Sequence, residues 1–128
     1  MDEKELVKIF KALGEPTRFR IVKLLSILPM CVCEIGEVLS ILQPRVSQHL
    51  KILREAGLVK EKREGYWVIY HLDNEKFTAL SNTFESYLKL DLEETPGFEE
   101  ESLRLDKMAK EGSLRHARNR GAQENSQS

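Results

Sequence analysis

The 128-residue sequence predicts a mainly α-helical fold with one β-hairpin, in the order α-α-α-α-β-β-α. Apolar residues recur at helical spacing over most of the first 56 residues and again after residue 74. Between these stretches, "LVKEKREGYWVIYHL" contains two β-prone runs around a charged turn. Prolines and glycines stand where the helical pattern stops. A chain of this length is expected to form one domain and a tail.

Two helices are expected before Pro29. Gly14 suits the end of the first, whose apolar positions are Leu6, Ile9, Phe10 and Leu13. Pro16 fits the first turn of the second, "PTRFRIVKLLSIL", and Pro29 closes it. The core candidates of this second helix are Phe19, Ile21, Val22, Leu24, Leu25 and Leu28.

Two shorter helices follow, joined by a tight turn. The stretch "CVCEIGEVLS" predicts the first, with inward side chains at Val32, Ile35, Val38 and Leu39. Gln43 and Pro44 begin the second, which runs to Ala56 and stops at Gly57. Its apolar stripe is Val46, Leu50 and Leu53. Two such helices followed by a basic hairpin predict a winged helix-turn-helix.

The hairpin turns around Glu64 and Gly65, and a fifth helix is expected from about residue 74 to residue 90. The segment "EETPGFEEE" breaks this helix at Pro96 and Gly97. We therefore expect a winged helix-turn-helix DNA-binding and dimerisation domain at 1–92. Residues 93–128 are expected to form a polar, largely disordered extension, with one or two helical turns in "LRLDKMAK".

The net charge of −1 hides a segregation of charge along the chain. Between residues 43 and 63 the bases are Arg45, Lys51, Arg54, Lys60, Lys62 and Arg63, against the acids Glu55 and Glu61. Between residues 91 and 101 there are six acids and no base. A local positive face is what phosphate binding requires, so nucleic acid remains a candidate partner.

The fourth helix and the hairpin carry the expected contacts to double-stranded DNA. In a winged helix-turn-helix the second helix of the motif enters the major groove and the wing touches the backbone. The candidate contacts are Gln43, Arg45, Ser47, Gln48, His49, Lys51, Lys62 and Arg63. Arg can pair with guanine, Gln with adenine, and Lys can neutralise phosphate. The alternative is an ordinary solvated helix face, and for His49 a cap against the preceding helix.

Cys31 and Cys33, the two cysteines of the chain, are separated by one valine. The charged N-terminus is unlike a signal peptide, and no apolar run is long enough to span a bilayer. A cytoplasmic protein without a membrane partner is therefore expected, and its thiols would stay reduced. Such a pair more often binds metal or senses oxidants than forms a structural disulfide, although two small buried side chains are the alternative.

Four stretches together resemble the ArsR/SmtB family of metalloregulatory repressors. They are "ALGEPTRFRIVKLL", "CVCEIGEVL", "LQPRVSQHLKILREAGLV" and "REGYWVIYHL", and the resemblance covers about residues 5 to 90. It implies a homodimeric repressor, bound to an operator with an inverted repeat until an inducer releases it. It also implies a thiolate site for a metal or metalloid ion at Cys31 and Cys33, with no organic cofactor.

The sequence departs from the better-known sensors of that family. Gly36 stands where arsenic sensors have a third cysteine, and residues 1–30 lack the cysteines of cadmium and lead sensors. The zinc ligands of other members correspond to Asn74, Lys76, Tyr87 and Leu90. A two-cysteine thiophilic site remains. We expect trivalent arsenic or antimony as inducer, with cadmium, lead and mercury as alternatives.

The spacing of the two cysteines predicts a mechanical consequence. Residues i and i+2 of an ideal helix point about 200° apart, so both thiolates could hold one ion only if the first helical turn unwinds or is distorted. The helix start is also expected to lower thiol pKa. A thiol redox-sensing regulator of the same fold is the alternative function, disfavoured because a disulfide between such near neighbours is strained. A thiol oxidoreductase is less favoured still, and no enzyme signature is evident.

Overall fold

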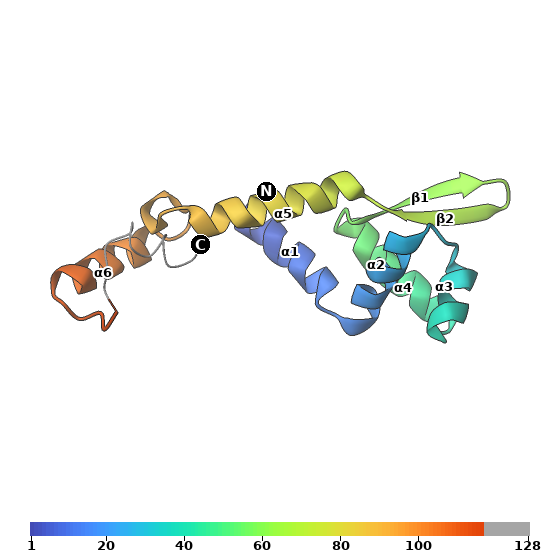
Figure 1. Cartoon of the computed structure of the whole chain (residues 1–128), viewed down its shortest axis with the longest axis horizontal. Coiled ribbons are helices and arrows are strands. Elements are labelled where there is room, and N and C mark those ends of the chain that lie inside the picture. Colours follow the sequence, from blue (N-terminus) through green and yellow to red (C-terminus); the bar gives the residue numbers. More distant parts are fainter. Residues whose placement is uncertain (117–128) are drawn as a thin grey trace. The chain divides into compact units, whose positions relative to one another are not determined.

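The computed structural model describes residues 1–116 (Figure 1). Its elements are α1 (Glu3–Leu13), α2 (Pro16–Ile27), α3 (Val32–Leu39), α4 (Gln43–Glu55), β1 (Val59–Glu64), β2 (Trp67–Leu72), α5 (Asn74–Lys89), the 3₁₀ turn η1 (Leu92–Glu94) and α6 (Glu99–Lys110). The predicted winged helix-turn-helix order is confirmed through α5. The chain divides into two compact units, residues 1–85 and the residues from 86 onward.

Polar side chains fix the starts of α1 and α2. Asp2 accepts a hydrogen bond from the Glu5 N–H at 2.8 Å, which caps α1. Glu15 accepts from the Arg18 N–H at 2.9 Å and precedes Pro16, the first residue of α2. Each carboxylate satisfies a backbone donor that has no partner within its helix.

The core of the first unit lies where α1 to α4 meet the base of the hairpin. Its most deeply buried side chains are Ile9, Ile21, Ile35, Val46, Leu50, Leu53 and Leu58. Three residues expected in the core are instead exposed: Phe19 by 63%, Leu28 by 49% and Val38 by 58%. Helices α2 and α3 each bury only a narrow face. In α2 this face is centred on Ile21 and Leu25, and in α3 on Ile35 and Gly36. A domain this small leaves the other apolar side chains in solvent.

A close backbone approach forms the turn between α3 and α4. Ser40 adopts the left-handed conformation with φ 56°, and the Ile41 N–H donates to the Gly36 carbonyl at 2.9 Å. Gly36 is buried, and a Cβ on it would lie 2.8 Å from the Ile41 carbonyl oxygen. The turn therefore needs glycine at this position, and the turn sets the direction in which α4 begins.

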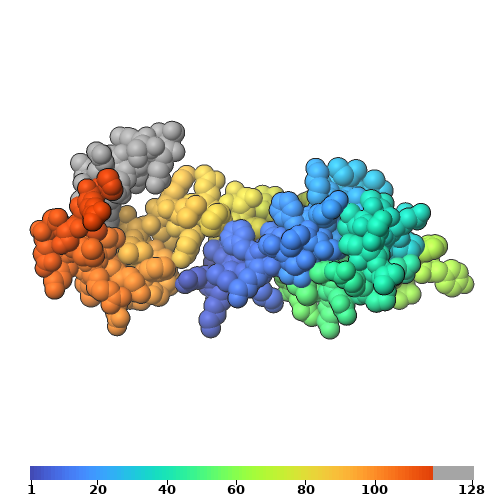
Figure 2. All heavy atoms as spheres, turned by 90° about the horizontal axis from the view of Figure 1, so that it is seen from below, coloured from blue at the N-terminus to red at the C-terminus, as the bar shows by residue number. Residues whose placement is uncertain are grey.

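Strands β1 and β2 pair antiparallel around a turn at Gly65, whose φ is 63°. The register opposes Lys62 to Ile69 and Arg63 to Val68. Successive side chains of a strand point to opposite faces, so Lys62 and Arg63 lie on different faces of the hairpin. The hairpin projects beyond α3 and α4, as Figures 1 and 2 show from two directions.

The second unit contains more helix than predicted. Helix α6 has 12 residues, whereas one or two turns were expected there. Its first turn holds Glu99, Glu100 and Glu101 and its last turn Lys107 and Lys110, a charge order that favours the helix dipole. The division at residue 92 stays a prediction. The expected disordered tail lies outside the described residues from residue 117 on.

Candidate nucleic-acid interface and thiol pair

Helix α4 presents a continuous polar surface to solvent. It begins at Gln43, as predicted, and is held from behind by Val46, Leu50 and Leu53, which are all buried. Five of the predicted contacts are among the exposed side chains of this helix: Gln43, Arg45, Ser47, Gln48 and Lys51. This surface offers amide and guanidinium groups near the N-terminus of the helix, where base edges are read in helix-turn-helix complexes.

His49 lies differently from its neighbours on α4. Its side chain is 15% exposed, with Nδ1 3.7 Å from Glu15 Oε2. Arg18 Nη1 approaches the same Nδ1 atom at 3.3 Å. The alternative left open was a cap against the preceding helix; the contacts of His49 are with Glu15 and Arg18 at the start of α2.

The hairpin exposes both Lys62 and Arg63, on its two faces. An ion pair at its base was not predicted: Arg54 Nη1 of α4 lies 2.6 Å from Glu61 Oε2 of β1. Both side chains are nearly half exposed, so this pair contributes little to stability. It does join the end of α4 to the wing.

The two thiols meet at the start of α3. Cys31 is the N-cap, in extended conformation with φ −85° and ψ 167°, and Cys33 is the second residue of the helix. Their sulfur atoms lie 2.9 Å apart, and both thiols are free. The premise that both thiols point apart from within one helix is therefore wrong, because Cys31 stands outside the helix and the ideal helical angle does not apply to it. A change at the helix start when an ion binds stays a prediction.

Glu34 completes this helix start and was missed as a site residue. Its Oε1 accepts a hydrogen bond from the Cys31 N–H at 3.0 Å, while the Cys31 side chain faces the Glu34 N–H in a reciprocal capping box. The bond from the Cys31 N–H lowers the pKa of the Glu34 carboxyl. A capping residue followed three positions later by Glu is the sequence signal that could have found it.

The predicted lowering of thiol pKa is wrong for Cys31. Burial, followed by the hydrogen bond with Cys33, raises the pKa of this thiol to about 11, although the hydrogen bond from the Glu34 backbone N–H acts to lower it. Only 6% of Cys31 is exposed, so the thiolate form would lose most of its hydration. At neutral pH Cys31 therefore holds its proton.

The residue before the thiol pair connects it to the wing. The Met30 N–H donates to the Tyr70 carbonyl at 3.2 Å, and the Tyr70 N–H donates to the Met30 carbonyl at 2.8 Å. Together they form an isolated antiparallel bridge between the α2–α3 loop and β2. The thiol pair thus lies between two parts of the candidate interface, with α4 beyond α3 and the wing beyond Met30.

One position compared with the zinc ligands of other members forms an ion pair instead. Within residues 1–116, no group of three or more His, Cys, Asp or Glu side chains could hold a metal ion. At one of the positions compared with zinc ligands, Lys76 Nζ instead donates to Glu5 Oε1 at 2.8 Å. No helix in the same range is both long and apolar enough to cross a membrane.

Known regulatory proteins are similar to this chain in sequence. Residues 15–61 match the arsR family of bacterial regulatory proteins. The chain is 45% identical over 74 residues to MJ1325 of Methanocaldococcus jannaschii, an uncharacterized HTH-type transcriptional regulator, covering 57% of this chain and 83% of that one. It is 45% identical over 67 residues to the arsenical resistance operon repressor of Escherichia coli, covering 52% of this chain. That alignment spans 57% of the E. coli protein.

A solved structure agrees in fold. The crystal structure of a possible transcriptional regulator for arsenical resistance superimposes with a TM-score of 0.57 and 30% identity, covering 78% of this chain and 94% of that one. The sequence match to residues 15–61 includes α2, α3 and α4, which hold the thiol pair and the exposed polar helix. With 83% of the M. jannaschii regulator and 94% of the solved regulator covered, this chain belongs to the ArsR family of bacterial regulatory proteins.

Proposed function

We propose that this protein is a DNA-binding transcriptional repressor that leaves its operator when Cys31 and Cys33 bind a thiophilic ion. The observation that carries the proposal is the 2.9 Å separation of the two sulfur atoms at the start of α3, which packs against the exposed polar helix α4. The name of the E. coli relative supports arsenic as the first candidate, and other relatives have names for arsenic or cadmium resistance.

The donor set fits a soft ion. Metal–sulfur bonds of about 2.3 Å require sulfurs within roughly 4 Å of each other, and this pair meets that condition. Thiolates select soft ions, so we propose trivalent arsenic or antimony, with cadmium, lead or mercury as alternatives. A bound ion would supply a bridge between the two sulfurs.

Arsenic generally takes three donors, and this chain has two cysteines. We propose that solvent or a small cellular thiol fills the third position. X-ray absorption on protein prepared without added thiols should then show two sulfurs and one lighter atom per arsenic. Three sulfurs would mean that two subunits share an ion and that the sites are not independent.

On DNA, the side chains of α4 and of the wing divide into those that read bases and those that bind phosphate. Arg45 and Gln48 are suited to paired hydrogen bonds with guanine and adenine in the major groove. Lys51, Lys62 and Arg63 are suited to phosphate, which fixes the position of the protein without reading sequence. Gln43 and Ser47 lie at the same exposed helix start and complete the proposed contacts.

Movement of Cys31 has two routes to this surface. Helix α3 packs on α4, so a change at the start of α3 is transmitted to Arg45 and Gln48 through the core. Met30, the neighbour of Cys31, is hydrogen-bonded to Tyr70 of the wing. Holding the two thiolates at a new separation would therefore shift Arg45, Gln48 and the wing together.

The repressor is proposed to act as a homodimer through α1 and α5. Val7, Phe10 and Phe84 are 44%, 39% and 39% exposed, so one protomer leaves apolar side chains of α1 and α5 uncovered. The rings of Phe10 and Phe84 pack edge to face with their centroids 4.9 Å apart, so the two helices share one apolar surface. Two α4 helices would then read an inverted repeat whose halves lie about 34 Å apart.

Operator selection followed by ion release tests the proposal. A binding site is selected from random duplex DNA, and a gel shift is repeated with arsenite, antimonite, cadmium, lead, mercury, zinc and peroxide. Release by a thiophilic ion at low concentration, lost in Cys31→Ser and Cys33→Ser, is expected. Failure to select any sequence, or release that survives both substitutions, would refute it.

Thiol oxidation is a second candidate, because sulfurs 2.9 Å apart are close enough to react with each other after one is oxidised. The strain argument against it rests on how near the two cysteines are in sequence, and the short distance between their sulfur atoms is the observation in its favour. Release by peroxide alone, reversed by a dithiol, would favour this function over ion sensing.

A further inference from the structure

We propose that Arg18 and His49 form a clamp that holds α4 in its orientation relative to α1 and α2, so that His49 positions the reading helix and does not itself read bases. This inference rests on the proposed DNA-binding function. Three observations carry it: the contacts of Arg18, the direction of His49, and the groove beside them.

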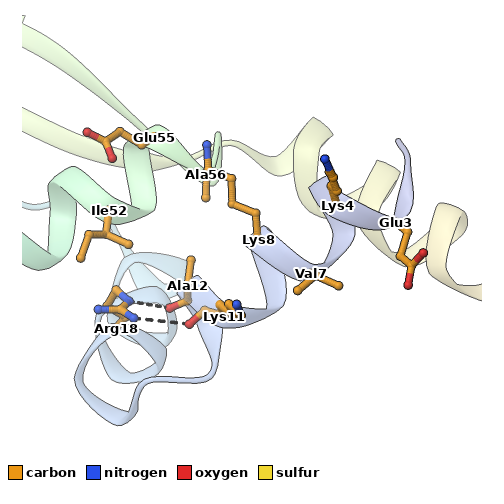
Figure 3. A pocket seen from close by; sticks show the side chains of 10 residues that line it. All are labelled: Glu3, Lys4, Val7, Lys8, Lys11, Ala12, Arg18, Ile52, Glu55 and Ala56. Carbon is orange, nitrogen blue, oxygen red and sulfur yellow. Dashed lines mark hydrogen bonds between the residues drawn. The ribbon is translucent and has the colours of Figure 1, made fainter.

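Arg18 joins three helices through one guanidinium group. Its Nε donates to the Ala12 carbonyl at 2.7 Å and its Nη2 to the Lys11 carbonyl at 3.3 Å (Figure 3). These carbonyls belong to the last turn of α1, where backbone acceptors lack helical partners. The remaining arm, Nη1, faces His49 Nδ1 of α4 at 3.3 Å.

Arg18 is the donor in this contact, because a guanidinium group can only donate. The side chain of His49 turns away from solvent toward α2, where Glu15 Oε2 lies 3.7 Å from the same Nδ1 atom. Its neighbour Gln48 is exposed on the proposed reading surface. Adjacent residues of a helix point about 100° apart, so fixing His49 also fixes the direction in which Gln48 points.

A groove of about 710 Å³ runs beside the clamp between α1 and α4. Figure 3 shows Val7 of α1 and Ile52 of α4 facing it, with Arg18 at one end. Both apolar side chains are at least 40% exposed, so α1 and α4 are not closely packed there. Where packing leaves such a gap, directional hydrogen bonds from Arg18 have more influence on the angle between the helices.

A double-mutant cycle on operator affinity tests the clamp. His49→Ala and Arg18→Ala should each weaken operator binding by roughly tenfold, the size of one charge-assisted hydrogen bond. The double variant should lose little more than either single variant, because the two side chains act as one unit. His49→Asn, whose Oδ1 can take the place of Nδ1, should recover most of the affinity.

Base preference separates positioning from reading. The affinity of His49→Ala is measured for a set of half-sites, each with one base pair changed. These affinities should all fall by the same factor, whereas loss of a base contact would relax the preference at one base pair. Additive losses in the cycle, or a change confined to one position, would overturn the clamp. Arg20→Ala is the matched control for Arg18→Ala, because Arg20 is an exposed arginine of α2, the helix that holds Arg18. This variant should change operator affinity less than twofold.

Two further measurements keep the test decisive. Thermal melts show whether each variant folds, and Arg18→Lys, which keeps the charge but cannot make the three-way contact, replaces Arg18→Ala if that variant unfolds. The unmodified protein is assayed first. If it selects no operator, the proposed function fails; if it binds and the cycle is additive, only the clamp fails.

Discussion

Met30 and Tyr70 exchange two backbone hydrogen bonds, of 3.2 and 2.8 Å, across 40 residues of sequence. This bridge adds a short third segment to the two-stranded wing and ends one residue before Cys31. A backbone bridge cannot be altered without moving both partners. A movement of the loop that carries the thiol pair is therefore expected to move the wing as well.

Ion binding is expected to change hydrogen exchange at this bridge. Cys31 follows Met30 directly. Holding the two sulfurs together should therefore weaken or shorten the hydrogen bond that the Tyr70 N–H donates to the Met30 carbonyl. NMR-detected exchange of the Tyr70 amide should change on addition of arsenite, with no such change in Cys33→Ser. If only amides of α4 respond, coupling runs through α3 alone and the wing route is wrong.

Cys31→Ser should fold at least as stably as the unmodified protein, whereas Cys31→Ala should not. Serine is a preferred N-cap and its hydroxyl can accept from the Glu34 N–H, while alanine leaves that donor unpaired. We expect a gap of about 1 kcal/mol between the two variants in urea unfolding. Equal stabilities would show that the capping box contributes nothing to folding.

Alkaline pH should weaken folding through Cys31. The pKa of this thiol is raised by burial from 9.0 to about 11, so the folded chain holds the proton more tightly than the unfolded chain. The contribution is complete below pH 9 and is lost as the pH rises to about 11. The difference in unfolding free energy between the unmodified protein and Cys31→Ser should follow this course. A difference that is flat with pH contradicts it.

Substitutions on the DNA-facing side should fall into two groups. Arg45→Ala or Gln48→Ala should relax base preference by about 1 to 3 kcal/mol at one position of the half-site. Lys62→Ala and Arg63→Ala should weaken binding to all sequences and reduce its salt dependence.

Since Lys62 and Arg63 lie on opposite faces of the hairpin, their effects should be unequal, with one lowering the salt slope by about 1. Binding titrations over a range of salt concentrations measure this. Uniform losses from all four substitutions would contradict the assignment of α4 as the reading helix.

Residues with strong local preferences made most of the fold predictable. Pro16, Pro44 and Gly57 marked helix boundaries that the structure reproduces closely. Proline and glycine act on the backbone independently of what packs around them. The exposure of Phe19 and Val38 depends on tertiary packing, which periodicity does not describe.

The candidate site was predictable in composition and less so in geometry. The sequence placed the start of α3 at Cys31, and the structure places it at Val32, which turns two opposed thiols into a close pair. Sequence patterns do not locate a helix boundary to within one residue. The contact between Arg18 and His49 joins residues 31 positions apart, and nothing in local sequence relates them.

The close approach of Gly36 to the Ile41 carbonyl limits the number of sulfurs that α3 can offer to one ion. A cysteine at this position would lie almost one helical turn after Cys33, but its Cβ would stand 2.8 Å from a backbone oxygen. Accommodating it would open the turn that directs α4. In this chain a third thiolate on α3 would therefore be coupled to a change in the turn that leads into α4.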